Sequence, residues 1–298
     1  MRIKISGIRR SLGENVFMIF NYFFLAMFAF ACLYPMLHVL FASLSDNNLL
    51  MQHTGVLVAP RGFSAEAYQR VFTNPMILLG YRNTVFVLVV GVGLALLMTA
   101  LGAYFLSRKN VLFKKPVMLA IVFTMFFSGG MIPTYLNLLD LRLTDTLWGL
   151  ILPGMISAFN LIIMRTSFQQ IPESMTEAAI IDGAGHIQIL FRIILPLSKA
   201  IIAVMILFYG IGIWNSWFWA SIIIQTRELL PLQVILREIL LQNSLLEMAG
   251  GADIGEQESI AMTIRYATIM VATVPVLCLY PFLQKHFAKG VLIGGVKE

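Results

Sequence analysis

Residues 177–196 read EAAIIDGAGHIQILFRIILP, and this stretch is the most informative part of the chain. It is polar and interrupted by glycine, and it lies between long apolar segments. Gly183 can end a helix in a left-handed backbone conformation that other residues resist, and Pro196 ends or kinks the helix that reaches it. The stretch therefore predicts a helix, a turn and a second helix.

The residues at the start of the loop 171–198 set the expected bounds of the first helix. Pro172 suits the first turn of a helix, and Ser174 and Glu177 have the S-x-x-E spacing of a capping box. We therefore expect a helix that starts near residue 173 and runs towards Asp182.

The two predicted helices differ in their apolar faces. Ala178 and Ala179 carry little bulk, so one face of the first helix should let a second backbone approach closely. The second helix carries larger apolar residues at a helical period. These are Ile187, Leu190, Phe191 and Ile194. We expect this helix–turn–helix to lie at a membrane surface.

The composition is that of an integral membrane protein. The 298 residues are 59% hydrophobic and 12% charged, whereas a soluble domain is about a quarter charged. A membrane helix needs about 20 mostly apolar residues. Six segments qualify: 16–44, 77–106, 116–138, 147–168, 199–224 and 262–284. The first is too long for a signal peptide, so we expect an all-α domain over 1–298 with six retained spans.

The distribution of charge predicts the topology. Six spans put both termini on one side, together with the loops 107–115 and 169–198. That side holds 14 of the 21 basic residues and five acidic residues, a net charge of +9. The other side holds seven basic and ten acidic residues, a net charge of −3. The positive-inside rule therefore places both termini and the 177–196 stretch in the cytoplasm, and it explains the basic balance without nucleic-acid binding.

The long outer loop 225–261 begins with apolar residues at a helical period. These are Leu232, Ile235, Leu236, Ile239 and Leu240. Such a pattern favours a helix lying on the protein's own outer surface over a partner site.

The loop motif resembles the EAA loop of permease subunits from ATP-binding-cassette (ABC) importers. The matching positions are Glu177-Ala178-Ala179, Gly183, Ile193 and Leu195-Pro196. Over nearly its whole length the chain resembles the membrane subunit of a carbohydrate-uptake importer of the maltose-permease type. The stretches FSGGMIPTY at 127–135 and KGVLIGGVK at 289–297 are most similar to the branch for polysaccharide-derived oligosaccharides and aldouronates.

This resemblance implies a type I importer fold in a bacterial plasma membrane. The subunit would pair with a second, homologous permease and sit on two ATPase subunits, which would hold ATP and Mg. An extracellular solute-binding protein would deliver the carbohydrate. A helix over about 174–185 would couple the permease to the ATPase through Glu177, Ala178, Ala179, Asp182 and Gly183. The tail residues Gly294, Gly295, Val296 and Lys297 resemble a segment that contacts the ATPase pair.

The sequence shows no motif for catalysis by this chain. It contains no G-x-x-x-x-G-K-[ST] phosphate loop, so ATP would be hydrolysed on another subunit. No pair of its four histidines has metal-ligand spacing, and no nucleophile–base motif stands out. Cys32 and Cys278 both lie in apolar runs and do not indicate a disulfide framework. We therefore expect no enzyme activity, metal site or cofactor on this polypeptide.

Polar and aromatic residues within spans are candidates for the substrate pathway, because they are costly against lipid. Trp217 and Trp219 lie near the expected outer end of the fifth span and fit an interfacial aromatic belt. Four residues lie deeper and are the better candidates. These are Asn160, Tyr209, Trp214 and Asn215.

Two other classes of membrane protein compete with the importer interpretation. An ion-gradient-driven secondary transporter of a polar solute would need an intramembrane carboxylate, and all 15 acidic residues fall in loops, tails or helix ends. A membrane-embedded enzyme would need clustered catalytic residues at one depth, and none is visible in the sequence.

Overall fold

The computed structural model describes residues 12–109, 111–248 and 261–278. They divide into two compact units. One contains the described residues up to Val71 together with those from Asn243 to Met270, and the other those from Phe72 to Gln242 together with those from Val271 onward. The candidate tail 294–297 and the end of the sixth predicted span, 279–284, lie outside the described residues.

In the first unit a long helix is followed by shorter ones. The elements are α1 (Leu12–Ser43), α2 (Asn47–Met51) and most of α3 (Glu66–Thr73). Ala42, Leu50 and Leu57 form a small buried cluster with Phe41 and Tyr266 packed against it. The remainder of α1 exposes apolar side chains along nearly its whole length, which suits a membrane-facing helix.

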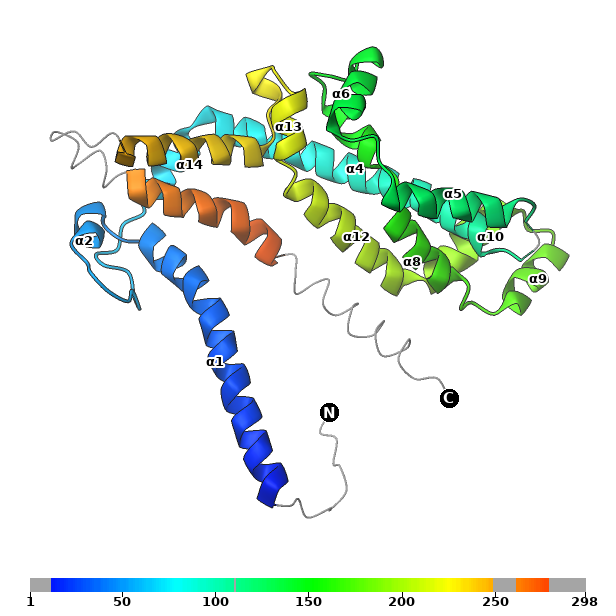
Figure 1. The fold of residues 1–298 in the computed structure, drawn as a ribbon, viewed down its shortest axis with the longest axis horizontal. Helices are drawn as coiled ribbons and strands as arrows, with labels where there is room; N and C mark the ends of the chain where they lie inside the picture. The colour runs from blue at the N-terminus through cyan, green and yellow to red at the C-terminus, as the bar shows by residue number, and fades with distance from the viewer. Residues whose placement is uncertain (1–11, 110, 249–260, 279–298) are drawn as a thin grey trace. The chain divides into compact units, whose positions relative to one another are not determined.

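The second unit contains the helices that follow, shown in Figure 1, and the last of them continues into the first unit from Asn243. Their bounds are α4 (Pro75–Ser107), α5 (Lys114–Phe126), α6 (Met131–Asp140), α7 (Leu147–Ile151), α8 (Ala158–Phe168), α9 (Glu173–Ile181), α10 (His186–Ile189), α11 (Leu195–Leu197), α12 (Lys199–Trp214), α13 (Phe218–Ile223) and α14 (Leu232–Met248). A π-helical turn, Leu190–Ile194, joins α10 to α11, and 3₁₀ turns cover Leu152–Gly154 and Arg227–Leu229. The described residues contain no β-strand.

Three described helices are long and apolar enough to cross a membrane, namely α1, α4 and Ala261–Cys278. Up to six spans result if each bent helix pair counts as one: Lys114–Phe126 with Met131–Asp140, Leu147–Gly154 with Ala158–Phe168, and His186–Leu197 with Lys199–Trp214. The all-helical prediction is confirmed for the described residues, and the six expected spans correspond to the upper end of this range.

The predicted span 116–138 is not one continuous helix. α5 and α6 meet at a bend of 114°. Between them Gly130 has a φ of 87° and a ψ of −178°, a backbone conformation that is essentially restricted to glycine. The fifth predicted span, 199–224, is also interrupted, because α12 ends at Trp214 and α13 begins at Phe218.

The core of the second unit lies where α4, α8 and α12 pack together (Figure 1). α4 buries small residues at every fourth position, which lets neighbouring helices approach closely. They are Gly91, Ala95, Thr99 and Ala103. Met164 of α8 and Met205 of α12 fill the adjoining space and are fully buried.

A buried polar contact joins the same three segments. The Tyr209 hydroxyl lies 2.7 Å from the Thr99 hydroxyl and accepts a hydrogen bond from the Ser157 backbone N–H at 3.1 Å. Such bonds fix helix positions in apolar surroundings, where an unpaired hydroxyl would be costly.

The start of α14 packs onto the N-terminal part of α4. Leu232, Ile235 and Leu236 are buried, and the Leu232 backbone N–H donates to the Thr84 hydroxyl at 2.8 Å. The Asn83 side-chain amide donates to the carbonyl of Glu228 at 2.7 Å. The prediction that this amphipathic segment lies on the protein's own surface is confirmed for the start of the helix.

We expect Gly149→Ala to destabilise the second unit. An ideal Cβ on Gly149 would lie 2.2 Å from the carbonyl oxygen of Leu143, so the backbone must shift. Overpacking of this kind costs about 1–3 kcal/mol, which should lower the melting temperature of the detergent-purified protein. Gly93→Ala is the matched control, because an added Cβ there meets nothing within 4 Å. Equal melting temperatures for the two variants would contradict the assigned packing.

Candidate functional site

The loop 171–198 begins with the short helix α9. It starts directly after Pro172 and has Asp182 at its C-terminal cap, so it is shorter than the 174–185 helix implied by the resemblance. Gly183 follows with a φ of 79°, and the Ala184 backbone N–H donates to the carbonyl of Ala179 at 2.9 Å. The prediction that Gly183 ends this helix in a left-handed conformation is confirmed.

The predicted capping box is wrong. Pro172 occupies the N-cap position and makes no side-chain capping bond. Because the helix starts at Glu173, Ser174 lies within its first turn instead of before it. Glu177 is therefore an exposed mid-helix carboxylate with no capping task.

The two alanines of the motif lie on different faces of α9. Ala179 is buried with Thr176, whereas Ala178 is exposed. The predicted smooth alanine face is thus divided between an inner and an outer surface. Beside Ala178 the outer surface carries exposed apolar side chains, Ile180 at 47% and Ile181 at 85% exposure. These isoleucines were not among the predicted coupling residues, and their signal in the sequence is apolar character within a polar loop.

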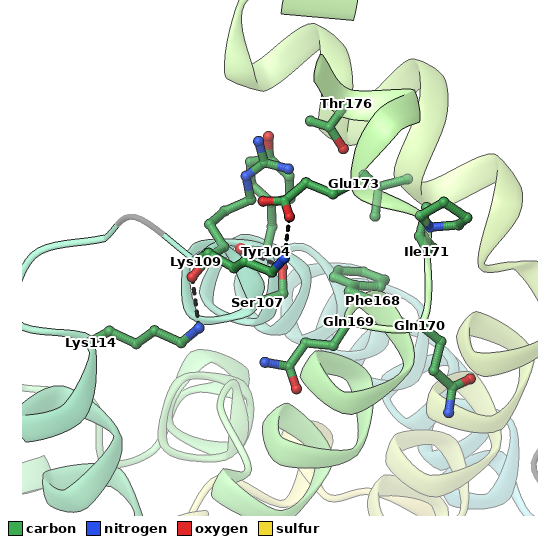
Figure 2. A pocket seen from close by; sticks show the side chains of 13 residues that line it. Tyr104, Ser107, Lys109, Lys114, Phe168, Gln169, Gln170, Ile171, Glu173 and Thr176 are labelled. Carbon is green, nitrogen blue, oxygen red and sulfur yellow. Dashed lines mark hydrogen bonds and ion pairs between the residues drawn. The ribbon is translucent and has the colours of Figure 1, made fainter. Parts of the chain in front are cut away.

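An ion pair ties the start of α9 to the end of α4. Lys109, two residues beyond α4, pairs with Glu173, and Figure 2 shows the two side chains meeting. This hydrogen bond, reinforced by the charge of Glu173 and to a smaller extent that of Glu177, raises the pKa of Lys109. Both partners are substantially exposed, so the pair orients α9 more than it stabilises the fold.

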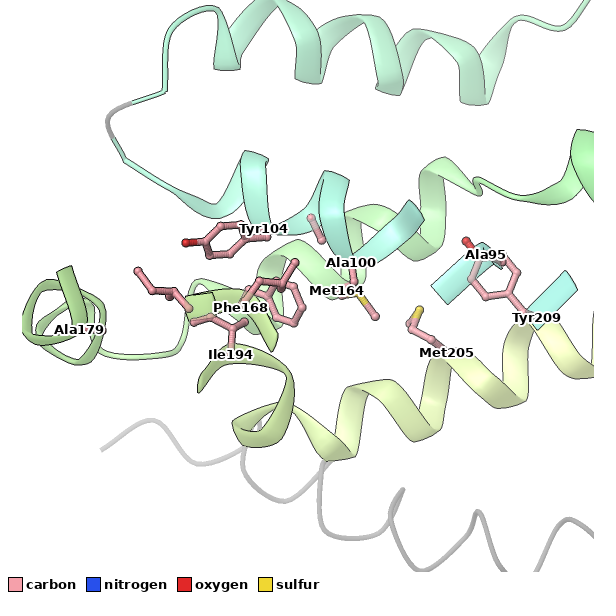
Figure 3. Close-up of a cluster of buried hydrophobic side chains, with 12 residues drawn as sticks. Ala95, Ala100, Tyr104, Met164, Phe168, Ala179, Ile194, Met205 and Tyr209 are labelled. Atoms are coloured by element: carbon pink, nitrogen blue, oxygen red, sulfur yellow. The ribbon is translucent and has the colours of Figure 1, made fainter. Parts of the chain in front are cut away.

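Apolar packing continues this connection into the bundle. Ala179 belongs to the same buried cluster as Phe168 of α8, Ile194 and Tyr209 of α12. Figure 3 shows the cluster extending from Ala179 at one end to Tyr209 at the other. The chain that follows α9 reaches α12 through helical residues His186–Leu197 and a bend of 87°. α9 is therefore mechanically linked to α12 by both packing and chain continuity.

A pocket of about 510 Å³ lies between α6, α7, α8, α12 and α13. Asn160 and Tyr209 line it, as do Phe208, Ser216 and Trp219. The last three were not among the predicted pathway residues, and Trp219 lines this pocket although the sequence suggested a membrane-interface belt. The wall of the pocket thus combines aromatic rings with hydroxyl and amide groups.

Asn160 is the most informative group in this pocket. The residue is 6% exposed, it lines the pocket, and within the described residues its side-chain amide makes no hydrogen bond. An amide that opens onto the pocket without a protein partner is available to bond to a molecule that enters.

The other two predicted pathway residues lie elsewhere. Trp214 is buried, and its indole N–H donates to the carbonyl of Ala272 at 3.1 Å. Asn215 is exposed at the C-terminal cap of α12. The structure brings Asn160 and Tyr209 together at one pocket and leaves Trp214 and Asn215 outside its lining.

Comparison with known proteins shows which family this architecture belongs to. No protein-family model matches the chain. It is 43% identical to the polygalacturonan/rhamnogalacturonan transport system permease protein YtcP of Bacillus subtilis, over 96% of this chain and 100% of that protein. It is 40% identical to protein LplC of the same organism, over 99% of each chain.

A solved structure gives the same answer. A chain from the crystal structure of a bacterial ABC transporter, involved in the import of the acidic polysaccharide alginate, matches with a TM-score of 0.86 and 33% identity. The match covers 94% of this chain and 100% of that chain. The chain belongs to the sugar ABC transporter permeases.

The family settles several predictions. The resemblance to carbohydrate-uptake permeases is confirmed, and this permease is a multi-pass protein of the bacterial inner membrane. Its relatives are transport subunits and are not enzymes themselves. Membership of an ABC transport system implies an ATPase and a binding protein as partners.

In this permease Asp145 joins the loop between α6 and α7 to the loop after α13 by hydrogen bonds, beside the 510 Å³ pocket. Its carboxylate accepts hydrogen bonds from the backbone N–H groups of Gln225 and Thr226 and from the Thr226 hydroxyl, at 2.7–2.9 Å. Its own backbone N–H donates to the carbonyl of Ile223, a pocket-lining residue. The hydrogen bonds from Thr226, followed by that from Gln225, lower the pKa of Asp145.

The lowered pKa predicts a pH-dependent contribution to stability. A carboxyl group whose pKa is depressed on folding stabilises the protein above its ordinary pKa of 3.8 and loses that contribution as the pH falls through the depressed value. We expect Asp145→Ala to have a lower melting temperature than the wild-type permease by a constant amount between pH 8 and pH 5, and the gap to shrink only below about pH 4. A gap that already closes between pH 7 and pH 5 would show that the carboxylate is not held in this way.

Proposed function

We propose that this permease moves an oligosaccharide into the cytoplasm by alternating access, driven by ATP hydrolysis on a separate ATPase subunit that docks against α9. The observation that carries the proposal is the two-sided character of α9. Its inner side enters the helix core through Ala179, and its outer side presents Ala178, Ile180 and Ile181. An apolar outer surface on a polar loop suits a protein partner.

The proposed coupling follows the contacts inside the second unit. A shift of α9 would be passed to Ile194 and Phe168 by packing and to α12 by the chain itself. α12 carries Phe208 and Tyr209, which form part of the pocket wall. Movement at α9 would therefore change the shape of the pocket without any catalytic group on this chain.

The proposed topology puts both termini and α9 in the cytoplasm, on the strength of the charge distribution. The full assembly would comprise a second homologous permease, two ATPase subunits with ATP and Mg, and an extracellular solute-binding protein. Glu177, Asp182 and Gly183 would belong to the ATPase-coupling surface together with the two alanines. The tail Gly294–Lys297 remains a proposed ATPase contact.

The pocket supports a carbohydrate as the cargo. Aromatic rings such as Phe208 and Trp219 suit the apolar faces of sugar rings, and Asn160 and Ser216 suit their hydroxyl groups. Of two similar transporters, one is named for polygalacturonan/rhamnogalacturonan transport and the other is involved in alginate import. By analogy, an oligosaccharide released from a plant or algal polysaccharide is the favoured cargo class.

The ion-gradient alternative has less support. Within the part of the chain that the structure describes, no carboxylate lines the 510 Å³ pocket, and the relatives are ABC transport subunits. The energy source is therefore assigned to ATP.

Gly183 gives the sharpest test of coupling. An added Cβ there meets nothing within 4 Å, so only the positive φ of 79° requires glycine. A β-branched residue pays about 1–2 kcal/mol for a left-handed conformation, whereas asparagine tolerates it. In proteoliposomes we expect Gly183→Val to keep ATP hydrolysis but to lower sugar uptake per ATP several-fold, and Gly183→Asn to stay near the wild type. Normal uptake by Gly183→Val would refute the coupling role of this turn.

Asn160 tests the permeation pocket independently of coupling. Asn160→Leu keeps the approximate volume but removes the amide, so we expect the KM for oligosaccharide uptake to rise roughly fivefold, the equivalent of one hydrogen bond. Thr166→Val is the control on the same helix, because its exposed hydroxyl bonds only to the carbonyl of Ile162. If both variants transport alike, the pocket is not the sugar pathway.

A further inference from the structure

A separate pocket of about 310 Å³ lies at the end of α4, next to α9 (Figure 2). Its walls come from the end of α4, the following connection, the start of α5, the segment after α8 and the first turn of α9. Among the described residues, Arg108, Lys109 and Lys114 line it and Glu173 is the one lining carboxylate, so this lining has a net charge of +2. A hollow with this charge attracts an anion.

The positive charge is not neutralised within the described residues. Glu173 engages Lys109, while neither Arg108 nor Lys114 forms an ion pair with a described carboxylate. Arg165 adds a further cation behind the wall, where its side chain donates to the carbonyl of Leu106 at 3.1 Å. Half-buried cations gain from a counter-ion, and the described residues supply none for two of them.

The Lys114 ammonium is held in place. It donates to the carbonyl of Arg108 at 2.7 Å, a contact drawn in Figure 2. Just before it, Phe113 has a left-handed backbone with a φ of 59°, which turns the chain into α5. A tethered ammonium with N–H groups to spare is a suitable partner for phosphate oxygen.

The position of the pocket selects the kind of anion. α4, a candidate membrane span, ends at Ser107 in the pocket wall, which would place the pocket near the level of lipid headgroups. From Lys114 onward α5 continues as an apolar surface with exposed Leu119 and Phe123. A phosphodiester headgroup could enter the pocket while its acyl chains lie along α5.

We propose that this pocket binds the headgroup of an anionic phospholipid, with Arg108 and Lys114 holding its phosphate. The headgroup would rest against the first turn of α9 and compete for Lys109 with Glu173. Lipid binding itself does not depend on the proposed transport function. If α9 does couple the permease to an ATPase, the lipid would also influence that step.

Native mass spectrometry of the detergent-purified complex tests the proposal directly, with phosphatidylglycerol and phosphatidylcholine as probes. We expect the wild-type permease to retain phosphatidylglycerol in preference to phosphatidylcholine. Removal of both charges in Arg108→Gln/Lys114→Gln should weaken retention about 25-fold, or about fivefold for each charge.

Two control variants separate the pocket from general surface charge and from misfolding. Lys115→Gln removes an adjacent exposed charge that does not line the pocket and should retain the lipid as the wild type does. Arg108→Lys/Lys114→Arg keeps both charges and should also retain it. Loss of lipid in Lys115→Gln to the same extent as in the double Gln variant would overturn the site.

Three further outcomes would also overturn it. Unchanged phosphatidylglycerol retention by the double Gln variant would show that these cations do not hold the lipid. Full displacement of the lipid by soluble glycerol phosphate would indicate a site for a small phosphate. If the double Gln variant kept the lipid but lost the ATPase subunits, Arg108 and Lys114 would be assigned to protein docking.

Discussion

The close approach of α8 and α12 to α4 is the constraint on which the rest of the second unit depends. Small residues at every fourth position of α4 allow this approach, and the contact between the Thr99 and Tyr209 hydroxyls fixes it at one depth. Tyr209 has two further roles. Its hydroxyl accepts a hydrogen bond from the Ser157 N–H, and the residue lines the 510 Å³ pocket. The same packing that stabilises the bundle therefore shapes the proposed sugar pathway.

The loop motif at 177–196 packs against this core. Ala179 places α9 at one end of a buried cluster that reaches Tyr209 at the other, while Gly183 turns the chain back towards the bundle. The end of α4 meets α9 a second time through the Lys109–Glu173 ion pair, beside the basic pocket. The proposed ATPase-docking helix, the proposed lipid site and the proposed sugar pocket are thus all built from one set of helices. Exposed polar contacts join these helices at the edge, and apolar packing joins them inside.

Parts of this arrangement could be predicted from the sequence, where the signal is local. Apolar length predicted the helices, and the single glycine at 183 predicted the end of α9, because its backbone freedom acts at one residue. The capping box failed for a related reason: S-x-x-E is also compatible with a helix whose N-cap lies two residues earlier, at Pro172 instead of Ser174. The span 116–138 was predicted as continuous although it breaks at Gly130, since apolar composition continues through a bend that depends on backbone conformation.

The sequence by itself determined that this chain is a helical membrane protein, where its short polar helix ends, and that it resembles sugar importers. These follow from apolar length, from glycine conformation and from a motif with fixed spacing. Only the tertiary structure decided which alanine of the motif faces inward, that Asn160 and Tyr209 share a pocket that Trp214 does not line, and that Arg108 and Lys114 meet at one hollow. The physical reason is that a helical sequence specifies directions around its own axis, whereas the neighbour that each direction meets depends on how the helices pack.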